Sequence, residues 1–145
     1  MKIAFACDHG GFPLRDEILK YLAKSGHEVL DFWAYESIIL DDFPDYAEQV
    51  SRALIEKKAE RGVLICWTGI GMSIAANRHT GIRAVLAYNP EIAKISRSHN
   101  NANIICFWAR TMQSETVISS LDSFLTENFI GGKYQQRNEK LDCSW

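Results

Sequence analysis

The chain has 145 residues, 47 % of them hydrophobic, and a formal net charge of −2, which together predict one domain, residues 1–145, with a substantial buried core. The slightly acidic balance and the lack of a lysine- or arginine-rich run argue against nucleic-acid binding. No run of 18 apolar residues could cross a membrane and no signal-peptide pattern is present, so we expect a cytoplasmic protein with no membrane partner.

Short apolar runs alternate with amphipathic stretches along the whole chain. This is the pattern of repeated βαβ units, so we predict an α/β fold, a three-layer αβα sandwich around a five-stranded parallel, Rossmann-like sheet. The predicted strands are residues 2–7, 28–32, 63–67, 83–87 and 103–107.

The first predicted helix lies between the first two strands, with Pro13 in its first turn and Gly26 after its end. A second helix is expected over residues 44–58. Asn89-Pro90-Glu91 combines an asparagine cap, a proline at the first helical position and an acid near the positive end of the helix dipole. This third predicted helix ends close to His99.

The last long helix is predicted to be capped by Ser114 and to reach residue 128. Gly131-Gly132 then begins a polar tail that carries several cations. The four cysteines lie far apart, with no Cys-x-x-Cys pair and no histidine at zinc-ligand spacing, so we expect neither disulfides nor a metal site. They are Cys7, Cys66, Cys106 and Cys143.

Two glycine-containing loops are predicted to meet at one edge of the sheet. In open α/β sheets, ligands bind beyond the carboxyl ends of the strands, where the strand order reverses. With the order 2-1-3-4-5, this point separates the first and third strands, which lead into Asp8-His9-Gly10-Gly11 and Thr68-Gly69-Ile70-Gly71. Neither loop has a nucleotide-binding fingerprint, but their backbone amides can hold a small anion or an enolate oxygen.

Cys66 ends the predicted third strand, immediately before the second of these loops. A following helix amino terminus favours negative charge on the sulfur, which makes Cys66 a candidate reactive residue. Free cysteines are also among the most buried residue types, so a small core side chain is the alternative interpretation. The spacing alone leaves both open.

Six segments together resemble a known family, and the resemblance covers essentially the whole chain. They are Ala6-Cys7-Asp8-His9-Gly10-Gly11, Asp42-Phe43-Pro44-Asp45-Tyr46, the run from Cys66-Trp67-Thr68-Gly69 to Asn77, Gly81-Ile82-Arg83-Ala84, Ser98-His99-Asn100 and Gln135-Gln136-Arg137. In this order they are similar to the type B ribose-5-phosphate isomerases and the related galactose-6-phosphate isomerase subunits.

The resemblance implies a metal-independent aldose–ketose isomerisation of ribose 5-phosphate and ribulose 5-phosphate in the pentose phosphate pathway, with no cofactor. Cys66 matches the family's catalytic cysteine, which acts as a thiolate base. His99, assisted by Thr68, matches the residue that opens the sugar ring. Backbone amides from Gly69 to Ser73, including Gly71, are placed to stabilise the enediolate oxygen.

The resemblance also implies which residues bind the substrate and how the chain assembles. Asp8, Tyr46 and Asn100 match sugar contacts, and His9, Arg110, Lys133 and Arg137 match phosphate contacts. The family's active site is shared between subunits, with the His99 region or the basic tail reaching the Cys66 crevice of another copy, so we expect a homodimer, which can pair into a tetramer.

The chain departs from the family pattern in two places. Trp67 stands where glycine is usual, and Lys133 and Tyr134 stand where arginine and histidine are common. A hexose 6-phosphate isomerase acting on allose or galactose phosphates, or a subunit of one, therefore remains an alternative. A flavodoxin-like module that holds flavin in the same crevice is a second alternative.

Overall fold

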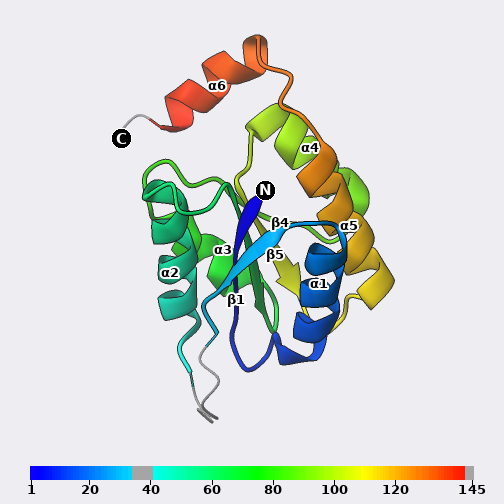
Figure 1. Cartoon of the computed structure of the whole chain (residues 1–145). Helices are drawn as coiled ribbons and strands as arrows, with labels where there is room; N and C mark the ends of the chain where they lie inside the picture. The colour runs from blue at the N-terminus through cyan, green and yellow to red at the C-terminus, as the bar shows by residue number, and fades with distance from the viewer. Residues whose placement is uncertain (34–40, 143–145) are drawn as a thin grey trace.

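A computed structural model of the chain describes residues 1–33 and 41–142, so the predicted position of Cys143 lies outside the described residues. Five parallel strands form one sheet, which confirms the predicted α/β class (Figure 1). The strands are β1 (Lys2–Cys7), β2 (Glu28–Asp31), β3 (Arg61–Cys66), β4 (Ala84–Leu86) and β5 (Ile104–Trp108). Each predicted strand is present, with ends that differ by at most two residues.

The strand order is β2-β1-β3-β5-β4, so the predicted order of the last two strands is wrong. β5 is apolar over its whole length and pairs with both β3 and β4, whereas β4 has three half-buried residues and lies at the edge. The longer and more hydrophobic strand therefore takes the inner place, where both of its faces are covered. The reversal between β1 and β3 stays where it was predicted.

Six helices are described: α1 (Phe12–Lys24), α2 (Phe43–Ile55), α3 (Ile70–Ala76), α4 (Pro90–Asn100), α5 (Ser114–Thr126) and α6 (Lys133–Leu141). Apolar residues of α1, α4 and α5 pack on one face of the sheet, and those of α2 and α3 pack on the other. Figure 1 shows these two helical layers on either side of the strands, as the three-layer prediction requires.

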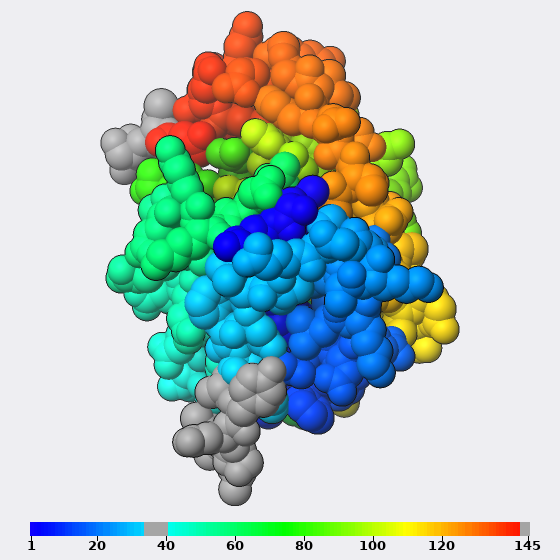
Figure 2. All heavy atoms as spheres, viewed as in Figure 1, coloured from blue at the N-terminus to red at the C-terminus, as the bar shows by residue number. Residues whose placement is uncertain are grey.

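Asn89 caps α4 as predicted, since its side-chain Oδ1 accepts a hydrogen bond from the amide of Ile92 at 2.8 Å. The segment after Gly132 is polar as predicted, and the structure shows in addition that it is helical, since α6 begins directly after Gly132. Asn138 of α6 donates a hydrogen bond to the carbonyl of His99 at 3.1 Å, which fastens α6 to the end of α4. The space-filling view in Figure 2 shows the red atoms of α6 lying over this end of the molecule.

None of the helices described is both long and apolar enough to cross a membrane.

Candidate active site

The two predicted loops meet at the edge of the sheet formed by the carboxyl ends of the strands, which we call the carboxyl edge. The amide of Asp8 donates to the carbonyl of Ile65 at 3.2 Å. A Cβ at Gly10 would lie 2.9 Å from the amide nitrogen of Trp67, and one at Gly11 would lie 2.6 Å from the Ile65 carbonyl oxygen. Only glycine permits so close an approach, and it brings the first loop against the end of β3.

Cys66 is the last residue of β3 and is 5 % exposed, with its sulfur at the carboxyl edge. Its Sγ accepts a hydrogen bond from the amide of Gly69 at 3.0 Å. The chain then enters α3, whose first amides have no acceptor within the helix itself. A donor on the sulfur and free helical amides beside it both stabilise a negative charge there.

Gly69 makes this arrangement possible. Its φ is +73°, and a Cβ would lie 2.8 Å from the carbonyl oxygen of Phe107 in β5. In any other residue, the positive φ would strain the backbone and the Cβ would collide with this carbonyl oxygen.

The other two described cysteines differ from Cys66. Cys7 and Cys106 are fully buried strand residues. Burial raises the pKa of the Cys7 thiol to about 12 and also raises the pKa of Cys106. Both therefore remain neutral thiols at physiological pH.

Asp8 is buried at the carboxyl edge, and its Oδ1 accepts a hydrogen bond from the amide of Gly11 at 2.9 Å. Burial raises the pKa of the Asp8 carboxyl, although the hydrogen bond from Gly11 opposes the rise. Its carboxylate thus closes the turn and also lies within the loop that faces Cys66.

Asp41 is the residue at this edge that sequence analysis missed. It accepts hydrogen bonds from the backbone and ring of His9, and it forms an ion pair with that ring. It also shares a hydrogen bond with the hydroxyl of Tyr46, whose pKa is raised to about 12 by burial and by this carboxylate. Asp41 lies 32 residues from His9 in sequence, so no local motif could have linked them.

Thr68, Ser73 and Gly71 surround the start of α3. Thr68 Oγ1 accepts from the amide of Ile70 at 3.3 Å, and Ser73 Oγ donates to the carbonyl of Ile70 at 2.8 Å. A Cβ at Gly71 would lie 2.7 Å from the ring of Phe43, so α2 packs closely here. These three predicted residues all lie beside Cys66 along the chain.

Trp67 occupies the family's glycine position without backbone strain. In the described part of the chain, the non-glycine residues with positive φ are Lys57 and Asn101, so the φ of Trp67 is not positive. Its indole is exposed, and the guanidinium of Arg110 lies 5.2 Å from the ring centroid. The indole therefore forms a platform that holds Arg110 at the carboxyl edge.

The remaining predicted residues lie elsewhere. The His99 and Tyr134 rings stack with centroids 4.1 Å apart and planes 9° apart. Lys133 Nζ and Arg137 Cζ lie 5.2 and 5.9 Å from the centroid of the Tyr134 ring. Asn100, which follows His99 in the chain, is exposed. We call these five residues the amino-edge cluster: His99, Asn100, Lys133, Tyr134 and Arg137.

The amino-edge cluster lies at the opposite edge of the sheet from Cys66. Helix α4 returns the chain to the start of β5, and the carbonyl of Asn103, just beyond this helix, accepts from the amide of Gly62 near the start of β3. From the Gly62 level to the Cys66 level, the strands rise by about 13 Å. Figure 1 shows α6 at the top and the loop between β1 and α1 at the bottom. One chain therefore does not bring His99 to Cys66.

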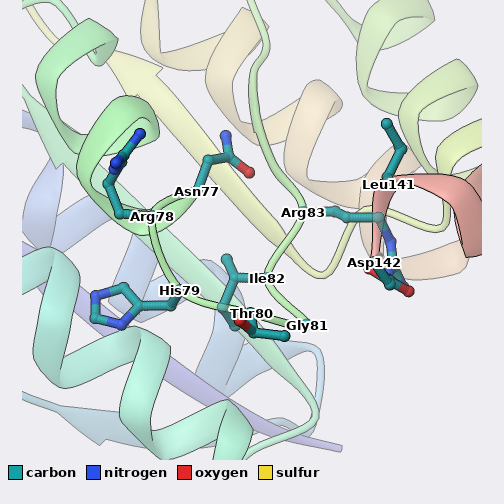
Figure 3. A pocket seen from close by; sticks show the side chains of 9 residues that line it. All are labelled: Asn77, Arg78, His79, Thr80, Gly81, Ile82, Arg83, Leu141 and Asp142. Atoms are coloured by element: carbon teal, nitrogen blue, oxygen red, sulfur yellow. The ribbon is translucent and has the colours of Figure 1, made fainter. Parts of the chain in front are cut away.

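A cavity of about 470 Å³ lies at the amino edge, between residues 77–83 and the end of α6. Figure 3 shows Arg83 pointing toward Leu141 and Asp142, and Arg83 donates to both carboxylate oxygens of Asp142 at 3.0 Å. A second cavity of about 240 Å³ shares Asn77 and Arg83 and reaches Asn100. Within residues 1–33 and 41–142, no group of three or more His, Cys, Asp or Glu side chains is placed to hold a metal ion.

Comparison with known proteins assigns the chain to a family. The profile described as Ribose/Galactose Isomerase matches residues 3–141. The chain belongs to this family. Ribose-5-phosphate isomerase B of Escherichia coli is 43 % identical over 142 residues, which cover 97 % of this chain and 93 % of the relative.

Solved structures of the family agree with the fold. A ribose 5-phosphate isomerase from Thermotoga maritima has a TM-score of 0.93 and 43 % identity and is matched over 97 % of both chains. A ribose-5-phosphate isomerase B from Clostridium thermocellum has a TM-score of 0.94 and 39 % identity, over 98 % of this chain and 95 % of that one. As a member of the ribose/galactose isomerase family, the chain is an aldose–ketose isomerase, which decides against the flavin-binding alternative.

Proposed function

We propose that this protein interconverts ribose 5-phosphate and ribulose 5-phosphate without a metal ion, as a cytoplasmic enzyme of the pentose phosphate pathway. The similarity to proteins named ribose-5-phosphate isomerase B supports the substrate. The observation that carries the chemistry is the hydrogen bond from the Gly69 amide to the sulfur of Cys66, at the start of α3.

The Cys66 thiolate is the base in the proposed mechanism. It takes the proton from C2 of the open-chain aldose, and the electron pair forms the C1–C2 double bond of an enediolate. The amides of the first turn of α3, around Gly71, donate to the developing oxygen charge. Cys66 then returns the proton to C1 while the hydroxyl proton moves from O2 to O1, so that the ketose forms with no net change in protons.

Ring opening comes before this step and needs an acid–base pair. We propose that His99 of a second copy supplies it, together with Thr68 at the carboxyl edge. A two-fold axis perpendicular to the strands makes the strands of two copies antiparallel, which places the amino edge of one copy beside the carboxyl edge of the other. Such a homodimer, or a tetramer made of two dimers, brings the amino-edge cluster to the Cys66 crevice.

Exposed apolar side chains support this pairing. Ile70 and Ile74, one turn apart on α3, are 47 % and 60 % exposed, and Tyr88 beyond the edge strand β4 is 59 % exposed. Large apolar residues left exposed on a helix face are typical of a surface covered by another protein. A second copy seated here buries them.

The phosphate group of the substrate requires cations, and both edges offer them. His9 and Arg110 lie at the carboxyl edge, while Lys133 and Arg137 lie in the amino-edge cluster. In the proposed homodimer, these four groups surround one phosphate. Asp8, Tyr46 and the partner's Asn100 then contact the sugar hydroxyls.

The base is tested by Cys66→Ala, assayed with ribose 5-phosphate. Loss of an acid–base group lowers kcat by about 10²- to 10⁴-fold. Cys7→Ala is the matched control, because it removes a buried thiol from the neighbouring strand and should retain most of the activity. Full activity in Cys66→Ala would show that the base is another residue, and an inactive wild type would refute the proposed function.

The shared site is tested by mixing two inactive variants, Cys66→Ala and His99→Ala. A mixed dimer has one site with both residues intact and one site with both removed. Random exchange of equal amounts should therefore restore about one quarter of the wild-type activity. If activity does not return although exchange is demonstrated, the two residues do not act across a dimer.

The alternative substrate is a hexose 6-phosphate, such as an allose or galactose phosphate, handled by this chain alone or as a subunit. The family description, which includes galactose, and the substitutions Lys133 and Tyr134 favour testing it. A higher kcat/KM for allose 6-phosphate than for ribose 5-phosphate would support it.

A further inference from the structure

Asp41 is a nearly buried carboxylate whose partners all belong to the candidate site. Its side chain is 7 % exposed. It accepts from the backbone amide of His9 at 3.2 Å and 3.1 Å through its two oxygens, and it pairs with Nδ1 of the same residue. The hydroxyl of Tyr46 is a further hydrogen-bond partner. Backbone and ring of His9 are thus held by one carboxylate, which fixes the side chain's position and rotation.

The pairing leaves the other ring nitrogen of His9 for a ligand. Nδ1 faces Asp41, and the His9 side chain is 47 % exposed, so Nε2 is the nitrogen available at the carboxyl edge. An imidazole that donates one N–H to a carboxylate has its ring orientation fixed and its basicity increased. The hydrogen bond to Asp41 raises the pKa of His9, while its partial burial opposes the rise.

The charges around His9 indicate how its pairing with Asp41 affects the binding of an anion. The titratable groups facing His9 are Asp41 and Asp8, and Tyr46 lies behind Asp41 as a neutral phenol with a pKa of about 12. Asp41 and Asp8 repel a phosphate dianion, and the Arg110 guanidinium on the Trp67 ring is one cation against these two carboxylates. A protonated His9 reverses the local charge on the side that faces the crevice.

We propose that Asp41 is a positioning residue, which holds His9 as an imidazolium and directs its Nε2–H toward the phosphate group of the substrate. The inference rests on the proposed function for the identity of the ligand. It assigns a role to a residue outside every motif on which the family resemblance rests.

Asp41→Asn tests the proposal, because asparagine keeps the size and a hydrogen-bond acceptor but removes the charge. At pH 8, the KM for ribose 5-phosphate should rise about tenfold, the effect of losing one charge-assisted contact, while kcat stays within about twofold. At pH 6, where an ordinary histidine is largely protonated, the rise should be less than about threefold. Asp45→Asn is the matched control, since it removes an exposed carboxylate from the same helix start and should leave KM unchanged at both pH values.

Proton NMR of the His9 ring measures the same effect without turnover. The titration midpoint of His9 should fall in Asp41→Asn and stay in place in Asp45→Asn, and inorganic phosphate should bind Asp41→Asn more weakly at pH 8. In a His9→Gln background, Asp41→Asn should cause no further change in KM. This second comparison remains informative if the single variant is less stable.

An unchanged His9 midpoint, an equal rise of KM at pH 6 and pH 8, or a loss confined to kcat would each overturn the proposal. A wild type that binds inorganic phosphate but does not isomerise ribose 5-phosphate would refute the proposed function instead. The NMR and phosphate measurements would still decide the role of Asp41 in that case.

Discussion

Gly69→Ala should lower the free energy of unfolding more than Gly81→Ala does, although each substitution adds one methyl group. Both residues have positive φ, +73° and +81°. At Gly69 a Cβ would lie 2.8 Å from the carbonyl oxygen of Phe107, which is fixed in β5, whereas no heavy atom of the described residues beyond the chain neighbours lies within 4 Å at Gly81. The left-handed backbone costs an alanine about 1 kcal/mol after the loss of unfolded-state entropy is counted. Overpacking adds about 2 kcal/mol at Gly69 alone.

We therefore expect Gly81→Ala to lower the free energy of unfolding by about 1 kcal/mol and Gly69→Ala by about 3 kcal/mol. Urea unfolding at one fixed protein concentration measures both, because association with a second copy also contributes to stability. Both variants carry the backbone strain, so the difference between their free energies of unfolding measures the collision with Phe107 alone. A difference below about 0.5 kcal/mol would show that β5 yields to the methyl group and that the close approach is not required.

Three further outcomes are expected. Arg97→Ala should lower the free energy of unfolding in urea by about 2 kcal/mol, because the buried guanidinium donates at 2.6 Å to a backbone carbonyl that would lose its partner. Trp67→Gly should raise the KM for ribose 5-phosphate about threefold with little change in kcat, because Arg110 loses the ring that holds it; an unchanged KM would mean that Arg110 needs no platform. The stability difference between wild type and Asp41→Asn should be largest between about pH 4 and pH 6.5 in thermal unfolding. The depressed pKa of Asp41 gives stability that is lost as the pH falls through it, and the raised pKa of His9 gives stability that is lost as the pH rises through it, so a difference that keeps growing above pH 8 would contradict this pairing.

The sheet and the carboxyl edge could be predicted because their signals are local. Runs such as that of β3 are apolar over their whole length, and the glycines that follow mark where the backbone must approach another loop. The strand order of β4 and β5 could not be read in the same way. A crossover helix joins them equally well in either arrangement, and the choice depends on which strand has more apolar surface to bury.

The polar segment after Gly132 shows a second limit of the sequence. Its residues are mostly charged or polar, with too few apolar side chains to indicate a helix packed on a core, and its order comes from contacts that are distant in sequence. Tyr134 stacks on His99, and Asn138 donates to the His99 carbonyl. Arg83 pairs with Asp142 at the other end of α6, and contacts of this kind with distant residues leave no signal in the local sequence.

Asp41 illustrates the same limit within the candidate site. Asp41 lies just before the segment Asp42–Tyr46 and outside it, and its partner His9 follows β1, far away along the chain. Candidate site residues that belong to a motif could therefore be named from the sequence, while one whose pairing with His9 spans 32 residues could not.

In the proposed shared site, the two halves of the chemistry lie at opposite edges of the sheet of one chain, so we expect the enzyme to be sensitive to its own dilution. A lone protomer carries Cys66, the proposed base, at one edge of the sheet and His99, the proposed ring-opening residue, at the other, about 13 Å of strand apart at the least. The rate per milligram should thus collapse once the concentration drops below the dissociation constant of the pair, and a molecule that wedges the two copies apart would inhibit without ever resembling a sugar.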